Sequence, residues 1–211
     1  QLSYSQWYEQ TSGVSSQLAD VDFLNDNEGY AVGNSKVLKT LDGGTNWSIS
    51  YNCSYILESI TFTQNKTHVV GHNISTSESI YLRSFDNGFS WVETVLPTAG
   101  VLSDIFFPSN LIGYTIGSQG VLLKTVDGGN SWNPYGTGIS SMIEAIYFHD
   151  DNHGFAVGGF SGGYMYETLD GGSTWNEISV AATTFLQSIT FSSASVGYTV
   201  GWDGDIFKTT D

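Results

Sequence analysis

A short motif that returns along the chain is the strongest constraint on its fold. The first copy reads Thr40-Leu41-Asp42-Gly43-Gly44-Thr45-Asn46-Trp47, and a truncated last copy reads Thr209-Thr210-Asp211. The aspartates of the five copies lie 41 to 44 residues apart, at Asp42, Asp86, Asp127, Asp170 and Asp211. A period of about 40–45 residues is typical of one four-stranded blade of a β-propeller. The repeat therefore predicts an all-β propeller.

Each period opens with a short run rich in β-branched and aromatic residues, which predicts an innermost strand. These runs span residues 18–24, 57–63, 101–107, 143–149 and 185–191. A second run, first seen as Gly29-Tyr30-Ala31-Val32-Gly33, is flanked by glycines that indicate tight turns or close backbone approach. No segment shows sustained helical periodicity.

The repeats predict one domain, residues 1–211, folded as a five-bladed β-propeller of four-stranded antiparallel blades. The expected blades span residues 18–52, 57–96, 101–136, 143–180 and 185–211, the last completed by residues 6–11. The N-terminal segment is assigned to that place because Trp7 precedes Trp47 by one period. Such a strand closes the ring and protects two sheet edges.

The acidic composition of the chain limits the classes of molecule that we expect it to bind. There are 6 Lys and Arg against 21 Asp and Glu, which gives a net charge of −15. A field of this sign repels phosphate backbones and anionic lipids, so we expect no nucleic-acid partner. No run is long and apolar enough for membrane insertion. Cys53 is the single cysteine, so it has no disulfide partner within the chain.

In its boxes and its Gly-Tyr-Ala-Val-Gly element, the sequence resembles the BNR/Asp-box propellers. The combination with Leu38-Lys39-Thr40-Leu41-Asp42-Gly43-Gly44-Thr45-Asn46-Trp47 is most similar to the photosystem II assembly and stability factors. The resemblance covers essentially the whole chain and implies a propeller fold. The same repeat serves sialidases, xyloglucan-degrading glycosidases, sorting receptors and assembly factors, so function must be argued from the site.

The recurring box residues are expected to be structural. A short carboxylate ahead of two glycine positions accepts hydrogen bonds from its own turn, which assigns the five box aspartates to fixing the hairpins. The tryptophans offer large apolar surfaces for packing between blades. They are Trp7, Trp47, Trp91, Trp132 and Trp175.

A basic residue stands three positions before the box aspartate in four of the five repeats. These residues are Lys39, Arg83, Lys124 and Lys208, and the fourth repeat has Glu167 instead. Two readings are open: a ring that binds an anion, or alkyl stems that lie over aromatic rings with their heads paired to local carboxylates. The net charge favours the second.

Enzyme readings find little support. Sialidases of this repeat type bind the substrate carboxylate with three arginines, and this chain contains only Arg83. A glycosidase needs two opposed carboxylates, for which Asp20, Asp22 and Asp104 on the innermost strands are the available candidates. They are explained equally well as hydrated carboxylates lining a central tunnel. We therefore expect no catalytic residues.

A metal site is not indicated either. The histidines, His68, His72, His149 and His153, are too scattered for a recognisable ligand set. The run Asp150-Asp151-Asn152 has oxygen ligands of the kind calcium prefers but lacks a dedicated loop pattern. No cofactor is expected, and calcium is kept as an open alternative.

Ligand contacts are expected on the face opposite the box turns, where the repeat is least regular. The candidates are Tyr55, His72, Phe160, Phe185, Trp202 and Asp203. An aromatic ring beside a carboxylate suits a protein hot spot or the face of a sugar. Trp202 is singled out because no repeat position requires it.

Four sequons, at Asn46, Asn52, Asn65 and Asn73, match the N-glycosylation pattern. Together with the acidic surface they favour a secreted or cell-surface module that binds a protein partner or assembles with itself. A lectin-like carbohydrate-binding module is the alternative, and a glycoside hydrolase follows it.

Overall fold

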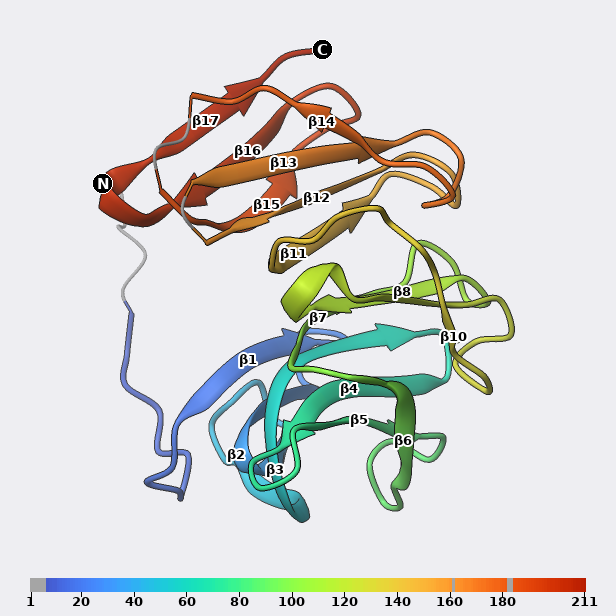
Figure 1. Ribbon diagram of the computed structural model, residues 1–211. Helices are drawn as coiled ribbons and strands as arrows, with labels where there is room; N and C mark the ends of the chain where they lie inside the picture. Colours follow the sequence, from blue (N-terminus) through green and yellow to red (C-terminus); the bar gives the residue numbers. More distant parts are fainter. Residues whose placement is uncertain (1–6, 161, 182–183) are drawn as a thin grey trace, which may run out of the picture.

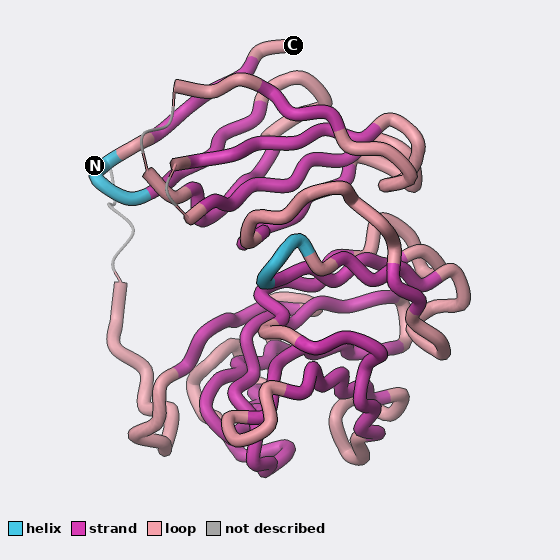
Figure 2. Tube along the Cα trace, viewed as in Figure 1, coloured by secondary structure: helices cyan, strands magenta, loops and turns pink. Residues whose placement is uncertain are grey.

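The computed structural model describes residues 7–160, 162–181 and 184–211, and these form antiparallel sheets stacked side by side (Figure 1). Within these ranges there is no α-helix (Figure 2). The only helical turns in them are of the 3₁₀ type, at Ser118–Gly120 and Trp202–Gly204. Accordingly, the described residues include no helix with the length and apolarity to span a membrane.

The first sheet contains six strands in sequence order. They are β1 (Leu18–Phe23), β2 (Gly29–Thr40), β3 (Ser48–Thr63), β4 (Lys66–Asn73), β5 (Glu78–Ser84) and β6 (Val92–Ala99). The 16-residue strand β3 pairs with β2 through its first half and with β4 through its second half. It thereby joins the first and second repeats in one sheet.

Each remaining repeat forms a sheet of its own. The second sheet comprises β7 (Leu102–Phe106), β8 (Gly113–Gly117), β9 (Leu122–Thr125) and β10 (Asn133–Pro134). The third comprises β11 (Ile143–Phe148), β12 (Gly154–Gly159), β13 (Gly163–Thr168) and β14 (Asn176–Ile178). The fourth comprises β15 (Leu186–Phe191), β16 (Gly197–Gly201) and β17 (Ile206–Thr209). Adjacent sheets contact each other through their innermost strands.

The all-β propeller is confirmed, but the prediction of five blades is wrong, because the described residues form four. The first two repeats merge since residues 48–63 contain no Gly or Pro that would end a strand where one repeat gives way to the next. Tyr51, Cys53 and Tyr55 instead pack against the core that both repeats share. One continuous strand results.

Closure of the ring by the N-terminal strand is also wrong. Residues 7–17 contain no strand, and Trp7 is 99% exposed. Residue 6, which was assigned to the same closing strand, lies outside the described residues. The segment from Glu9 to Gly13 has no run of β-branched or aromatic residues, so it offers little that would hold it in a sheet.

Glycines in the second strand of each repeat are required by close packing. A Cβ on Gly29 would lie 2.6 Å from the ring of Phe23, and one on Gly33 would lie 2.1 Å from the carbonyl oxygen of Gln17. The same contacts recur in the later repeats. The Gly-flanked element is therefore conserved within the chain by steric necessity.

Aromatic pairs form the core between successive repeats. In each pair, a phenylalanine at or next to the end of an innermost strand lies against an aromatic residue near the start of the second strand of the preceding repeat. In the second repeat, His68 holds the place of that aromatic residue. The pairs and the distances between their ring centroids are Tyr30 with Phe62 at 5.5 Å, His68 with Phe107 at 4.1 Å, Tyr114 with Phe148 at 4.0 Å, and Phe155 with Phe191 at 4.9 Å. Such contacts contribute beyond simple area burial.

The box aspartates bond to their own hairpins. In the fourth box, Asp170 accepts hydrogen bonds from the backbone N–H of Thr174 at 2.8 Å and from its hydroxyl at 2.7 Å. These bonds hold the pKa of Asp170 below its ordinary value. The buried hydroxyl of Thr168 donates to Asp170 and accepts the N–H of Gly172, at 2.9 and 2.8 Å. The first, second and third boxes have the same network.

We predict that Thr168→Val lowers the free energy of unfolding by about 1–3 kcal/mol, because it leaves the buried N–H of Gly172 without an acceptor. Urea denaturation followed by tryptophan fluorescence measures the change. Thr94→Val is the matched control, since Thr94 is exposed on β6. An equal decrease in the free energy of unfolding for the two variants would contradict the stabilising role assigned to the Thr168 hydroxyl.

Candidate functional site

Carboxylates on the innermost strands bond to the neighbouring repeat. Asp20 accepts the backbone N–H of Ile60 at 2.9 Å. Asp104 accepts the N–H of Ile146 at 3.0 Å and the hydroxyl of Ser59 at 2.9 Å. Both accepted N–H groups follow an irregularity in the ladder of their own sheet, between Leu57 and Ser59 and between Ile143 and Ala145. Asp20 and Asp104 therefore accept hydrogen bonds from backbone N–H groups beside irregularities in the strand pairing of the neighbouring repeat.

Burial raises the pKa of two carboxyl groups on the innermost strands, Asp104 and Glu144. Desolvation raises the pKa of Asp104 to about 6, although hydrogen bonds to its ionised form oppose the shift. Burial, together with the charges of Glu58 and Asp104, raises the pKa of Glu144 to about 7. The sequence argument missed Glu58 and Glu144. The signal was available, because both occupy the same innermost-strand position, directly after Leu57 and Ile143.

This group is poorly suited to chemistry. Both oxygens of Asp104 are occupied by protein donors. Asp22, the third carboxylate proposed, accepts the backbone N–H of Phe23 at 2.8 Å. Across the described ranges, no three His, Cys, Asp or Glu side chains are arranged to hold a metal ion. Asp150 is engaged in its own turn, where it accepts the N–H groups of Asn152 and His153.

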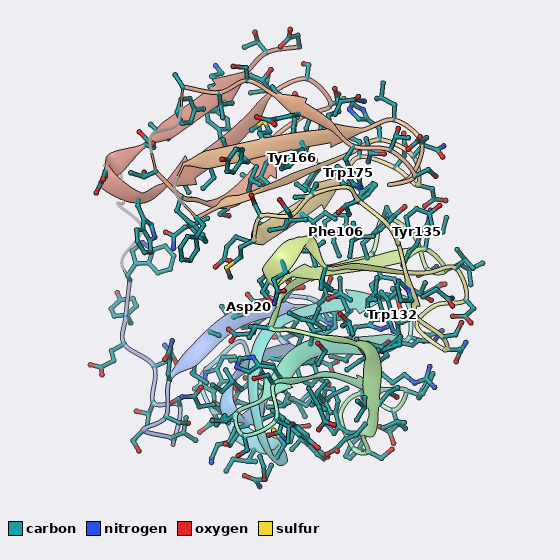
Figure 3. All side chains as sticks on the ribbon, viewed as in Figure 1. Asp20, Phe106, Trp132, Tyr135, Tyr166 and Trp175 are labelled. Atoms are coloured by element: carbon teal, nitrogen blue, oxygen red, sulfur yellow. The ribbon has the colours of Figure 1, made fainter. Side chains whose placement is uncertain are left out.

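The repeated basic residues connect successive repeats. Lys39 donates to the carbonyl oxygen of Asn87 at 2.5 Å, Arg83 to that of Gly129 at 2.8 Å, and Lys124 to that of Gly171 at 2.7 Å. Each acceptor lies in the box of the next repeat. Their cationic heads also lie over aromatic rings, as Lys124 does over Tyr114 and Tyr135 (Figure 3 labels Tyr135). The aromatic contacts agree with the predicted packing role, but the heads of these three residues bond to backbone carbonyl oxygens in place of the expected carboxylates. Lys39 also pairs with the carboxylate of Glu28 at 2.8 Å.

Three of the box tryptophans, Trp91, Trp132 and Trp175, lie between successive repeats. Trp132 and Trp175 lie between successive sheets (Figure 3). Trp91 contacts Tyr30 and Tyr51 in the first repeat, and Trp47 lies against Phe23.

The proposed ligand residues fall into two separate groups. Phe185 and Trp202 lie together at the end of the fourth sheet, with centroids 5.5 Å apart, and Trp202 is 59% exposed. Asp203 follows in the same turn with a φ of 58°. Tyr55 and His72 lie on paired strands of the first sheet, with the tyrosine hydroxyl donating to Glu93 and the histidine 3.6 Å from Glu58.

The other predicted residues lie apart from both groups. Phe160 is 90% exposed, just after β12. Among the sequons, the side chain of Asn46 donates to Asp42 at 2.7 Å, and Asn73 accepts backbone N–H groups of its own turn. Asn52 and Asn65 are exposed.

Sequence comparisons find similar proteins among the photosystem II assembly factors. Residues 1–96 match the model of a family described as photosynthesis system II assembly factor YCF48. A stretch of 77 residues is 38% identical to the chloroplastic photosystem II stability/assembly factor HCF136 of Guillardia theta. That stretch is 35% of this chain and only 20% of the relative.

Solved structures share the fold. A structure described as YCF48 bound to D1 peptide matches 100% of this chain and 96% of its own, with 17% identity and a TM-score of 0.55. A GH74 enzyme of Niastella koreensis matches 92% of this chain and 35% of its own, with 14% identity and a TM-score of 0.74. At such identities the likeness concerns the fold alone.

Fold and boxes together define a BNR/Asp-box β-propeller. Within residues 1–96 its sequence is similar to the photosystem II assembly factors, in agreement with the predicted resemblance. The expected secreted or cell-surface location is wrong, because the matched relative is a chloroplast protein. The glycoprotein reading likewise finds no support in these relatives.

The raised pKa of Glu144 predicts how stability depends on pH. Between about pH 4.5 and pH 7 the folded chain holds a proton that the unfolded chain has released, so stability falls as pH rises through this window. We expect Glu144→Gln to remove this part of the fall. The variant should gain about 1–2 kcal/mol over the parent at pH 8, allowing for partial solvent screening, and less at pH 4.5.

Urea denaturation across that pH range tests the prediction, with Glu9→Gln as the control because Glu9 is exposed on the N-terminal segment. A pH-independent difference between Glu144→Gln and the parent would contradict it.

Proposed function

We propose that this chain is a non-catalytic module that binds a segment of a partner protein. The observation that carries the proposal is the aromatic pair in which the exposed ring of Trp202 lies against the half-buried ring of Phe185. A solvent-exposed tryptophan on a rigid framework is the kind of residue that dominates the binding energy of protein interfaces.

The pair is held in place by its surroundings. The backbone N–H of Trp202 donates to the carbonyl oxygen of Phe185 at 3.0 Å, and the hydroxyl of Thr184 donates to the carbonyl oxygen of Trp202 at 3.0 Å. The N–H of Asp205 closes the turn by donating to the same carbonyl oxygen at 3.2 Å. A surface organised before binding loses little conformational entropy when a partner arrives.

Charge indicates the chemistry of the partner. The chain carries −15, and Asp203 lies beside Trp202 in the turn. Lys39, Arg83 and Lys124 already bond within the protein. An acidic field of this kind accelerates the approach of a basic segment and opposes an acidic one. We therefore propose that the ligand is a basic peptide segment that packs against the rings of Phe185 and Trp202.

The relatives support a protein ligand more than a sugar. One solved structure of the same fold is described as bound to D1 peptide. The glycosidase alternative needs free carboxylates on the innermost strands. Both carboxylate oxygens of Asp104 already accept hydrogen bonds within the protein. No feature of the described surface specifically favours a carbohydrate.

Selection of random peptides displayed on phage against the purified chain tests this function. We expect the selected peptides to be rich in Lys and Arg. Trp202→Ala should weaken their binding about 30-fold, corresponding to ~2 kcal/mol, because it removes the exposed indole. Isothermal titration calorimetry measures the affinities.

Phe89→Ala is the matched control, since Phe89 is an exposed aromatic residue (86%) on the second box. Its affinities should equal those of the parent. Failure to select any peptide would contradict the protein-binding function, and equal binding by Trp202→Ala would contradict the assignment to this surface.

A further inference from the structure

The second box contains the one Asn-Gly sequence of the chain, Asn87-Gly88. The first, third and fourth boxes have glycine at the place of the asparagine, with φ values of 69°, 67° and 67° at Gly43, Gly128 and Gly171. Asn87 adopts the same left-handed backbone conformation, with a φ of 55°. Asparagine tolerates this conformation better than most side chains but less readily than glycine. Among these four boxes, the second is therefore the one in which local opening relieves backbone strain.

The side-chain amide of Asn87 is exposed and unrestrained. Within the ranges that the structure describes, it has no hydrogen-bond partner. The asparagines of the first and third boxes differ in this respect. The side chain of Asn46 donates to the carboxylate of Asp42 at 2.7 Å, and that of Asn130 donates to the carbonyl oxygen of Asp127 at 2.6 Å. Asn87 alone of these three has an amide that is free to react.

The backbone nitrogen of Gly88 is the nucleophile that this amide can meet. Because glycine has no Cβ, the approach to its nitrogen is open. When this nitrogen attacks Cγ of Asn87, a N–Cγ bond forms and the Cγ–Nδ2 bond breaks. The side-chain nitrogen leaves as ammonia with the proton of the Gly88 N–H, and a succinimide ring remains. Water then opens the ring at either carbonyl carbon, which leaves aspartate or isoaspartate at position 87.

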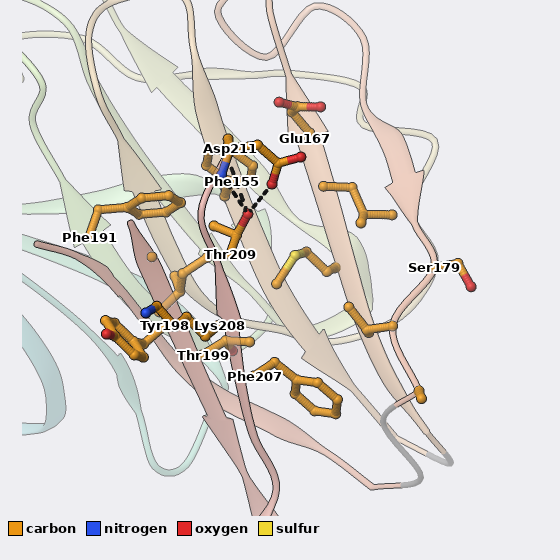
Figure 4. Close-up of a pocket in the computed structure, with 16 residues that line it drawn as sticks. Phe155, Glu167, Ser179, Phe191, Tyr198, Thr199, Phe207, Lys208, Thr209 and Asp211 are labelled. Atoms are coloured by element: carbon orange, nitrogen blue, oxygen red, sulfur yellow. Dashed lines mark hydrogen bonds between the residues drawn. The ribbon is translucent and has the colours of Figure 1, made fainter. Parts of the chain in front are cut away.

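The folded box keeps this nitrogen engaged. The N–H of Gly88 donates to the buried hydroxyl of Ser84 at 2.7 Å. That hydroxyl in turn donates to Asp86 at 2.9 Å. The fifth box repeats the second of these bonds between Thr209 and Asp211, at 2.6 Å (Figure 4). Ring closure at Asn87 therefore requires local opening of the second box.

The same peptide joins the second repeat to the first. Lys39 donates to the carbonyl oxygen of Asn87 at 2.5 Å, and the hydroxyl of Ser50 donates to that of Gly88 at 2.6 Å. A Cβ on Gly88 would lie 2.8 Å from the Ser50 hydroxyl and 2.9 Å from the ring of Tyr30. An isoaspartate carries the main chain through its Cβ and so lengthens it. The space around Gly88 does not accommodate that change with both bonds intact.

We propose that Asn87 is a site of spontaneous, irreversible deamidation. Opening of the second box releases the N–H of Gly88 and allows ammonia to leave, and the product joins the first two repeats less firmly. This inference does not depend on the surface of Phe185 and Trp202.

Ageing of the purified chain at mildly alkaline pH tests the proposal. Peptide mapping by mass spectrometry follows the exchange of ammonia for water at Asn87, and labelling with an isoaspartyl methyltransferase detects the isoaspartate. We expect the folded chain to react at least about tenfold more slowly than the chain unfolded in urea, because only the opened box reacts.

Two variants test the gate. Ser84→Ala should speed the reaction at least about fivefold, because it removes the hydrogen bond that engages the N–H of Gly88. Thr125→Val is the matched control, since the Thr125 hydroxyl accepts the N–H of Gly129 at 2.9 Å in the third box. This control loses the equivalent bond elsewhere and should keep the parent's rate at Asn87.

The deamidated fraction carries an additional negative charge, so ion exchange separates it from the parent. We expect it to unfold at a lower urea concentration. Asn87→Gly, aged in the same way, should show no new fraction, because glycine holds this place in the other three boxes.

Three results would overturn the proposal. The first is a reaction at Asn87 that is as fast in the folded chain as in urea. The second is equal rates for Ser84→Ala and Thr125→Val, which would assign the reaction to global unfolding. The third is a deamidated fraction that unfolds at the same urea concentration as the parent.

Discussion

Each junction between successive repeats depends on a close pair of aromatic rings that joins one repeat to the next. The ring centroids lie 4.0 to 5.5 Å apart at all four junctions. The glycines of the second strands allow this approach, because a Cβ on Gly29, Gly113 or Gly154 would collide with the phenylalanine of the same repeat. At three of these junctions, a lysine or arginine side chain also donates a hydrogen bond to the box of the next repeat. Packing and hydrogen bonding thus act at the same places.

Much of this architecture could be predicted from the sequence, because the period of the box and the Gly-flanked strands are local signals. The innermost strands lie close to the predicted ranges, as β7 (Leu102–Phe106) does within 101–107. The continuity of β3 could not be predicted, since it depends on tertiary packing of Tyr51 and Tyr55 against a shared core. The predicted closing strand was wrong although the sequence signal for it was present. Trp7 lies at the position that the period requires, but nothing in the described structure covers its ring.

The site was less accessible to sequence reasoning. Phe185 and Trp202 were both expected to contact a ligand, and the structure brings them together because the turn of Trp202 bonds to the carbonyl of Phe185. Tyr55 and His72 lie on the first sheet instead. The perturbed carboxylate Glu144 was missed, because its raised pKa arises from burial near Glu58 and Asp104, which are distant in sequence. These three residues become neighbours only when the innermost strands of successive repeats pack together.

The uninterrupted strand β3 also determines which repeats unfold together under mechanical force. Repeat arrays lose their units roughly one at a time when each unit contacts only its neighbours. Here the first two repeats share one backbone ladder, so neither can detach without breaking the hydrogen bonds of the other. Under tension these two repeats form a single cooperative block, whereas each later sheet is free to peel away separately.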